Sequence, residues 1–135
     1  MAIQLSAAVR NARLDAIETA IGASAILKIR TGSAPANVAA AATGTVLATL
    51  NLPSDWMAAA SSGSKALTGT WTDSSADASG TAAHFEITAT DGTTRHMQGT
   101  VTVTGGGGDL TVDSTSFTSG QAFTITSFTL TDGNA

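Results

Sequence analysis

The chain contains no cysteine and no tyrosine, and only 4 % of its 135 residues are aromatic. Disulfide bonds and thiolate chemistry are therefore excluded, and we expect the chain to fold equally well in a reducing compartment. Much of the hydrophobic content, 42 % in total, is alanine. The core must therefore be unusual in kind.

Charge is also scarce, because Asp, Glu, Lys and Arg make up 12 % of the residues, about half the usual share. The six basic residues form no cluster along the sequence, and no nucleic-acid partner is expected, since phosphate binding needs several cations on one face. No run of 18 apolar residues is present, and the segment 1–14 lacks the apolar centre of a signal peptide, so neither membrane insertion nor export is expected. A surface with so few charges is typical of a protein covered by neighbours in an assembly.

One helix is predicted, at 6–21, with Ser6 as its N-cap and Gly22 as its stop. Its apolar residues fall on about a third of the helical circumference. They are Val9, Leu14, Ile17 and Ile21.

Alternation of apolar and polar residues predicts seven strands. Their ranges are 24–30, 45–52, 66–72, 84–90, 95–104, 109–113 and 122–131. We therefore expect a single, mainly β domain spanning 1–135: an antiparallel β-sandwich or jelly-roll-like barrel of about seven strands, with one N-terminal α-helix. In the last strand the alternation shifts phase near Thr126 and Ser127, where we expect a bulge.

Two connecting segments show neither the helical periodicity nor the alternation typical of strands. The first, 31–44, is rich in small residues and is predicted to be a surface arm. The second is a run of glycines at 105–108. A phosphate-binding loop would need spaced glycines, a following lysine and a helix, whereas a strand-like segment follows here, so we predict a flexible connector.

The polar residues most suggestive of chemistry lie on a predicted hairpin that turns at 91–92. His84, Glu86, His96 and Gln98 are expected on its outward face. The two histidines would be roughly 13 Å apart, too far for one metal ion. A solvated strand face is the prediction, with a metal site and an interface as alternatives.

No spacing typical of a nucleophile elbow or a catalytic triad occurs, and neither histidine has an evident aspartate partner. We therefore expect no catalytic residue, no metal, no cofactor and no enzymatic activity.

Association with other chains is predicted instead. Trp56, after a Pro-Ser-Asp turn, belongs either to the core or to an intermolecular contact, and the helix packs either on its own sheet or against another subunit. The arm 31–44 is a second candidate contact. The predicted interface residues are Val9, Leu14, Ile17 and Trp56, and a homo-oligomer is expected.

Four stretches carry a resemblance to a known class of proteins. They are LSAAVRNARLDAIE (5–18), KIRTGSAPANVAAAATGTVLATLNL (28–52), DASGTAAHFEI (77–87) and GGDLTVDSTSFTSGQAFTITSFTLT (107–131). In this order they resemble small Thr/Gly/Ala-rich structural proteins of tailed bacteriophages. The resemblance implies a virion component assembled in the host cytoplasm, with major capsid or tail proteins as partners.

The resulting hypothesis is a non-enzymatic structural protein that decorates or stabilises the capsid through multivalent contacts. Two alternatives are a tail- or fibre-associated virion protein and a carbohydrate-binding module for attachment to a cell surface. Exposed aromatic side chains around a groove would favour the carbohydrate-binding module.

Overall fold

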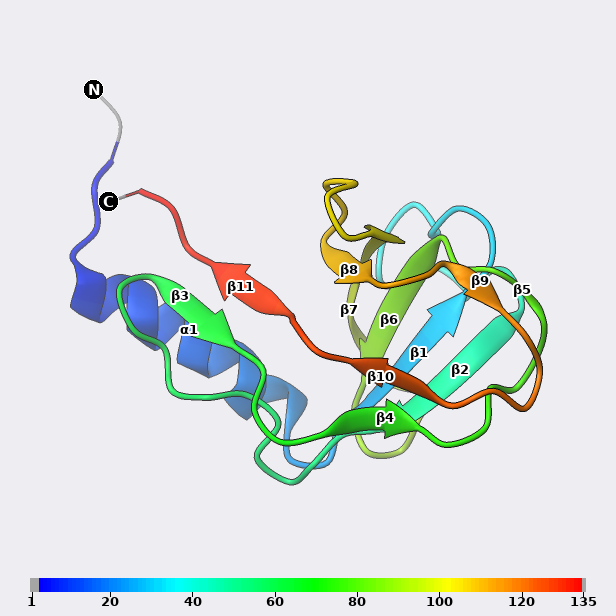
Figure 1. Ribbon diagram of the computed structural model, residues 1–135. Helices are drawn as coiled ribbons and strands as arrows, with labels where there is room; N and C mark the ends of the chain where they lie inside the picture. Colours follow the sequence, from blue (N-terminus) through cyan, green and yellow to red (C-terminus); the bar gives the residue numbers. More distant parts are fainter. Residues whose placement is uncertain (1–2, 135) are drawn as a thin grey trace.

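The computed structural model describes residues 3–134, in which it has one helix and eleven strands (Figure 1). The elements are α1 (Ala7–Ile21), β1 (Ile26–Arg30), β2 (Val46–Asn51), β3 (Ser64–Ala66), β4 (Trp71–Asp73), β5 (Gly80–Thr81), β6 (His84–Thr88), β7 (Arg95–Val103), β8 (Leu110–Val112), β9 (Ser116–Phe117), β10 (Phe123–Ile125) and β11 (Thr129–Thr131). The chain is therefore mainly β with a single N-terminal helix, as predicted.

Helix α1 begins and ends where the sequence predicts. The Ser6 hydroxyl accepts a hydrogen bond of 3.3 Å from the backbone N–H of Val9, which satisfies one of the free donors of the first turn. At the other end, the N–H of Gly22 donates to the carbonyl of Glu18 at a φ of 96°, a conformation that favours glycine. The helix then lies beside β3, away from the main sheet (Figure 1).

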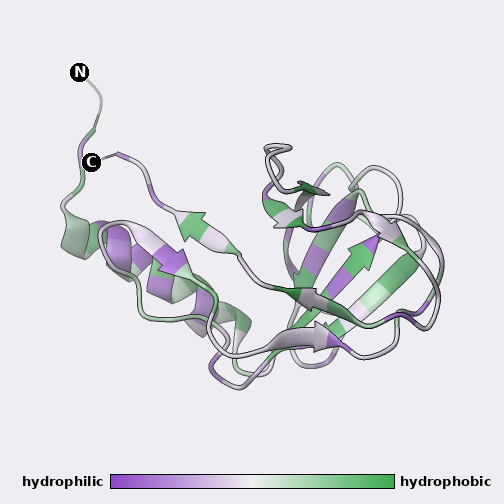
Figure 2. Cartoon of the chain, in the orientation of Figure 1, coloured by the Kyte–Doolittle hydropathy of each residue, from purple (hydrophilic) through white to green (hydrophobic). Residues whose placement is uncertain are grey.

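The main sheet is curled and five-stranded, with strand order β2-β1-β6-β7-β8 (Figure 1). The pairs within it are antiparallel except for the parallel pair β7–β8. Alternation along β1 follows the prediction, because Leu27 and Ile29 are buried on one face while Lys28 and Arg30 lie on the other. Figure 2 shows this change between hydrophobic and hydrophilic residues along the strands of the sheet.

The predicted strands 66–72 and 122–131 are each broken in two. Their pieces pair with each other, β4 with β10 and β3 with β11, in one interrupted antiparallel ribbon. In the first strand the break contains Gly69, whose φ is 72°. In the second it falls at 126–128, where a bulge was expected. The ribbon connects the main sheet to the α1 end of the molecule (Figure 1).

The prediction of about seven antiparallel strands is therefore wrong in number and in one pairing. In the described range, eleven strands form the five-stranded sheet and three two-stranded sheets. Two strands, β5 and β9, have two residues each, which is too short for alternation to reveal.

The parallel pair β7–β8 depends on the glycine-rich turn. Parallel strands usually need a connection of about a dozen residues or more, whereas here only 104–109 separates them. Within this turn Gly105 and Gly107 have φ values of 87° and 83°, and the N–H of Gly108 donates to the hydroxyl of Thr102 at 2.9 Å. The expected flexible connector is a hydrogen-bonded turn that returns the chain to the start of the parallel pairing.

Most of the buried apolar side chains form one cluster between the main sheet and the ribbon. Its centre is aromatic: the ring centroids of Trp56 and Trp71 are 6.0 Å apart, and those of Trp71 and Phe128 are 5.6 Å apart. Phe128 in turn meets Phe85 of the main sheet edge-on. Full burial contributes roughly 1.5–3 kcal/mol for each large apolar side chain. Apart from four alanines, the other buried members of the cluster are Leu, Ile, Val and Met, so large aliphatic side chains stabilise the core together with the aromatic ones.

Candidate functional site

The outer face of the main sheet carries a cluster of charged side chains. Lys28 and Arg30 lie on β1, Glu86 on β6 and Arg95 on β7. Lys28 is directly opposite Glu86 across β1 and β6. Because side chains alternate between the two faces of a strand, these residues share the face opposite to the aromatic core.

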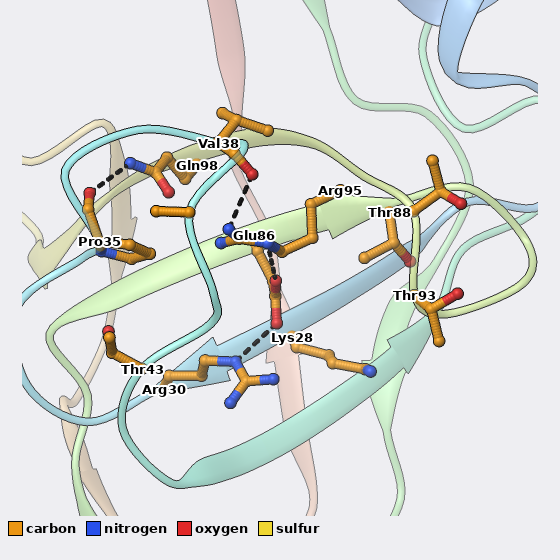
Figure 3. Close-up of polar contacts among 12 residues, drawn as sticks. Lys28, Arg30, Pro35, Val38, Thr43, Glu86, Thr88, Thr93, Arg95 and Gln98 are labelled. Atoms are coloured by element: carbon orange, nitrogen blue, oxygen red, sulfur yellow. Dashed lines mark hydrogen bonds and ion pairs between the residues drawn. The ribbon is translucent and has the colours of Figure 1, made fainter.

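Glu86 lies between two arginines (Figure 3). Its Oε1 accepts a hydrogen bond of 2.6 Å from Nε of Arg30, and its Oε2 is 3.5 Å from Nε of Arg95. The Glu86 side chain is 3 % exposed, against 14 % and 11 % for the two arginines. A carboxylate so deeply buried requires this compensation, because an unpaired charge in such a place is strongly destabilising.

The predicted surface arm 31–44 covers this charged face. Backbone carbonyls of the arm accept hydrogen bonds from the sheet: that of Pro35 from Gln98 and that of Val38 from Arg95 (Figure 3). The carbonyl of Gly44 accepts a further hydrogen bond from Arg30. The arm is thus held to its own sheet by side chains of β1 and β7.

A pocket of about 550 Å³ remains between the arm and the sheet. It is lined by Lys28, Arg30, Glu86 and Arg95, by 38–42 of the arm and by Gly92 and Thr93 of the β6–β7 turn. Three of the six basic residues of the chain meet here with one carboxylate, which gives the pocket a formal charge of +2 (three cations minus one anion) in a chain whose net charge is −4. Its volume lies in the range of small-molecule sites.

The prediction of a solvated strand face is wrong for two of its four residues. Glu86 is buried under the arm, and His84 is also buried, with its Nδ1 2.7 Å from the carbonyl oxygen of Gly32. Gln98 is half-buried, whereas His96 is exposed as expected. The structure does not bring the two histidines together, and in the range 3–134 no three His, Cys, Asp or Glu residues gather as a metal site.

A second charged cluster fixes α1 to the rest of the chain. Lys65 of β3 is 2 % exposed, and its ammonium lies 2.7 Å from Asp15 and 3.0 Å from Glu18 of the helix. The same two carboxylates accept hydrogen bonds from the backbone N–H groups of Ala60 and Met57. The segment 57–60 and β3 are thereby attached to one side of α1.

The charges of this cluster perturb one another. Burial disfavours the charged form of Lys65, but its hydrogen bonds to Asp15 and Glu18 outweigh burial and raise the pKa of Lys65 above its ordinary value of 10.5. The hydrogen bond from Lys65, followed by that from the Ala60 N–H, lowers the pKa of Asp15 below 3.8. Both shifts favour the ionised pair.

The four predicted interface residues differ in accessibility. Trp56 is completely buried and donates through Nε1 to the carbonyl of Gly22. Leu14 is also buried, and Ile17 is half-buried against the core. These three side chains pack within their own chain, so only Val9, at 46 % exposure, presents a large apolar surface.

Sequence reasoning missed the charged pocket because its basic residues are far apart along the chain. The available signal was their position: Lys28, Arg30 and Arg95 occupy outward positions on strands that neighbour β6. That signal becomes visible only when the strand order is known.

Comparison with family models, curated proteins and solved structures gave no match for this chain. In the described part of the chain, no helix is long and apolar enough to cross a membrane.

Proposed function

We propose that the chain is a non-enzymatic structural component of a tailed-bacteriophage particle that decorates or stabilises the capsid through protein–protein contacts. The resemblance of four ordered segments, which together cover most of the chain, supports this role. The low content of charged residues supports it as well, since such a surface suits a protein surrounded by neighbours.

The observation that carries the proposal is the exposed apolar surface at the start of α1. In the described range, three large hydrophobic side chains are largely exposed, and two of them, Ile3 and Val9, lie at this end at 79 % and 46 % exposure. Each of these side chains offers apolar area that a partner could remove from water. The opposite side of α1 is fixed by Lys65, so Val9 is presented on a rigid element and loses little entropy on docking, whereas Ile3 lies in the segment before the helix.

The proposed partners are major capsid or tail proteins and further copies of this chain. Many copies on a symmetric lattice would turn a weak contact at each helix into stable attachment, because linked contacts multiply in their effect. A tail- or fibre-associated protein would use the same surface at another place in the particle.

The carbohydrate-binding alternative has less support. All six aromatic side chains of the chain are buried: Trp56, Trp71, Phe85, Phe117, Phe123 and Phe128. None of them can therefore serve as an exposed aromatic platform for a sugar ring.

We further propose that the curled main sheet and the β4–β10 part of the ribbon, which enclose the core, form a distorted β-sandwich.

Val9→Ser tests the role of the exposed end of α1. We expect weaker self-association in sedimentation experiments and less incorporation into purified particles, by about fivefold for the loss of one partly buried valine contact. Electron microscopy of particles carrying the tagged chain would show whether it lies on the head or the tail.

Val103→Ser is the matched control, because Val103 has the same exposure of 46 % but lies at the end of β7. Both variants should keep the thermal stability of the wild type. Equal incorporation of the two variants, or absence of the chain from particles, would contradict the proposal.

A further inference from the structure

The charged pocket under the arm is a different surface from the exposed end of α1, and its composition indicates a ligand. Lys28, Arg30 and Arg95 outnumber the single carboxylate, Glu86, and the pocket is positive although the chain is negative. Glu86 is engaged by the two arginines. The excess positive charge is therefore associated with Lys28 and with the arginine nitrogens that do not face Glu86.

Several donors remain available in this pocket. Lys28 donates one hydrogen bond, of 2.8 Å, to the carbonyl of Gly92, although an ammonium has three protons. Arg30 uses Nε for Glu86 and Nη1 for Gly44, and in the range 3–134 its Nη2 has no acceptor. The Arg30 guanidinium is held by Glu86 and the Lys28 ammonium by the Gly92 carbonyl, so an incoming anion would meet a preorganised site.

The other wall of the pocket is apolar and small. It consists of Val38 and the four alanines 39–42 of the arm. A ligand that fits has an oxyanion facing the strands and a modest carbon skeleton facing the arm. A long polyanion is not required by this geometry, because the cations converge on one pocket and do not extend along the surface.

We propose that this pocket binds a small organic anion whose carboxylate or phosphate group contacts Lys28 and Arg30. Both oxyanions accept several charge-assisted hydrogen bonds, which are stronger than neutral ones. The site is separate from the contact surface on α1, so this proposal does not depend on the chain belonging to a phage particle.

The test is a titration of the full chain with inorganic phosphate and, separately, with glucuronate, followed by backbone amide NMR at constant ionic strength. We expect saturable shifts at Lys28, Gly92 and Thr93 with at least one of the two anions. Saturation with phosphate alone would identify a phosphate group as the ligand chemistry, and saturation with glucuronate alone would identify a carboxylate.

Lys28→Gln should raise the Kd by about tenfold, because one charge-assisted hydrogen bond is lost, and Lys28→Arg should restore binding. Arg13→Gln is the matched control: it changes the net charge equally, but Arg13 is 56 % exposed on α1, where it pairs with Asp132. Lys28 makes one side-chain hydrogen bond in the described range, so its variants are expected to fold, and the NMR spectra verify this directly.

Two results would overturn the proposal. One is that neither anion produces saturable shifts in the pocket. The other is that Lys28→Gln and Arg13→Gln weaken the shifts equally, which would show a response to net charge instead of a site.

Discussion

Nε1 of Trp56 donates a hydrogen bond of 2.9 Å to the carbonyl oxygen of Gly22, the residue that ends α1. The same indole ring packs against Trp71 in the centre of the core. One side chain therefore fixes the end of the helix to the core, and it does so from a loop that has no regular structure of its own.

Replacing Trp56 with Phe should lower the free energy of unfolding by about 2–4 kcal/mol. The substitution leaves the Gly22 carbonyl without its donor and opens a cavity beside Trp71. Urea unfolding measures the loss. Met57→Leu, a change of similar volume at the neighbouring buried position, should cost less than about 1.5 kcal/mol. A stable Trp56→Phe variant that failed to associate would instead place Trp56 at an interface.

Lys65→Ala should destabilise the chain by about 2–3 kcal/mol, because it removes the shared partner of Asp15 and Glu18. We expect a smaller loss of unfolding free energy than for a fully buried ion pair, because the Asp15 side chain is 46 % exposed and can be solvated. Lys28→Ala provides the comparison, with an expected loss below about 1 kcal/mol for a single hydrogen bond to a carbonyl. Chemical denaturation measures the unfolding free energy of both variants. Equal decreases for Lys65→Ala and Lys28→Ala would contradict a special role for Lys65.

Asp91 should contribute stability that depends on pH. The hydrogen bond from the Thr94 hydroxyl, followed by those from the N–H groups of Thr94 and Thr93, lowers the pKa of Asp91 from 3.8 to about 2. Since the folded-state pKa is the lower one, ionised Asp91 stabilises the fold above pH about 4, and this contribution is lost as the pH falls towards about 2.

Melting temperatures of the wild type and of Asp91→Ala, measured across this acidic range, should therefore converge as the pH falls. Asp113→Ala is a suitable control, because Asp113 is exposed and has no side-chain hydrogen bond in the described range. A difference between the wild type and Asp91→Ala that stays constant with pH would show that the turn does not depend on the ionised carboxylate.

The glycine turn should be sensitive at its even-numbered positions. A Cβ at Gly106 or Gly108 would lie 2.8 Å from side-chain atoms of Thr102, so alanine at either position should cost about 1–3 kcal/mol. Gly133→Ala, where a Cβ would meet nothing within 4 Å, should be nearly neutral. Thermal melting of the three variants tests this prediction. An unchanged melting temperature for Gly108→Ala would show that the segment is a flexible connector and not a closely packed turn.

Much of the secondary structure was predictable from periodicity and end signals. Helix α1 was predictable from its end signals, Ser6 and Gly22, and β1 from the alternation that buries Leu27 and Ile29. Strand β6 keeps the alternation in its sequence although the structure buries both of its faces. The breaks in the two ribbon strands were harder to predict from the sequence. They depend on the pairing of β4 with β10 and of β3 with β11, which joins segments distant in the chain.

The candidate site was largely hidden from sequence reasoning. Alternation places Glu86 correctly on the outward face of its strand, but the face is covered by the arm, whose residues have no pattern that shows where they pack. Lys65 was equally hidden from sequence reasoning. A single lysine among small residues does not indicate that it will be buried and paired with two carboxylates of the helix. Both features arise from contacts between segments that are distant in the sequence.

The interrupted ribbon also determines when the protein can fold during synthesis. Strand β11 at Thr129–Thr131 completes the pairing of β3, and Asp132 receives the ion pair from Arg13 of α1. A ribosome therefore releases the helix long before its last partners exist. Until then the apolar side of α1 can meet other nascent chains, and long-range pairing of this kind is slow and prone to misassembly. Binding of the emerging helix by a chaperone would protect the chain during this interval.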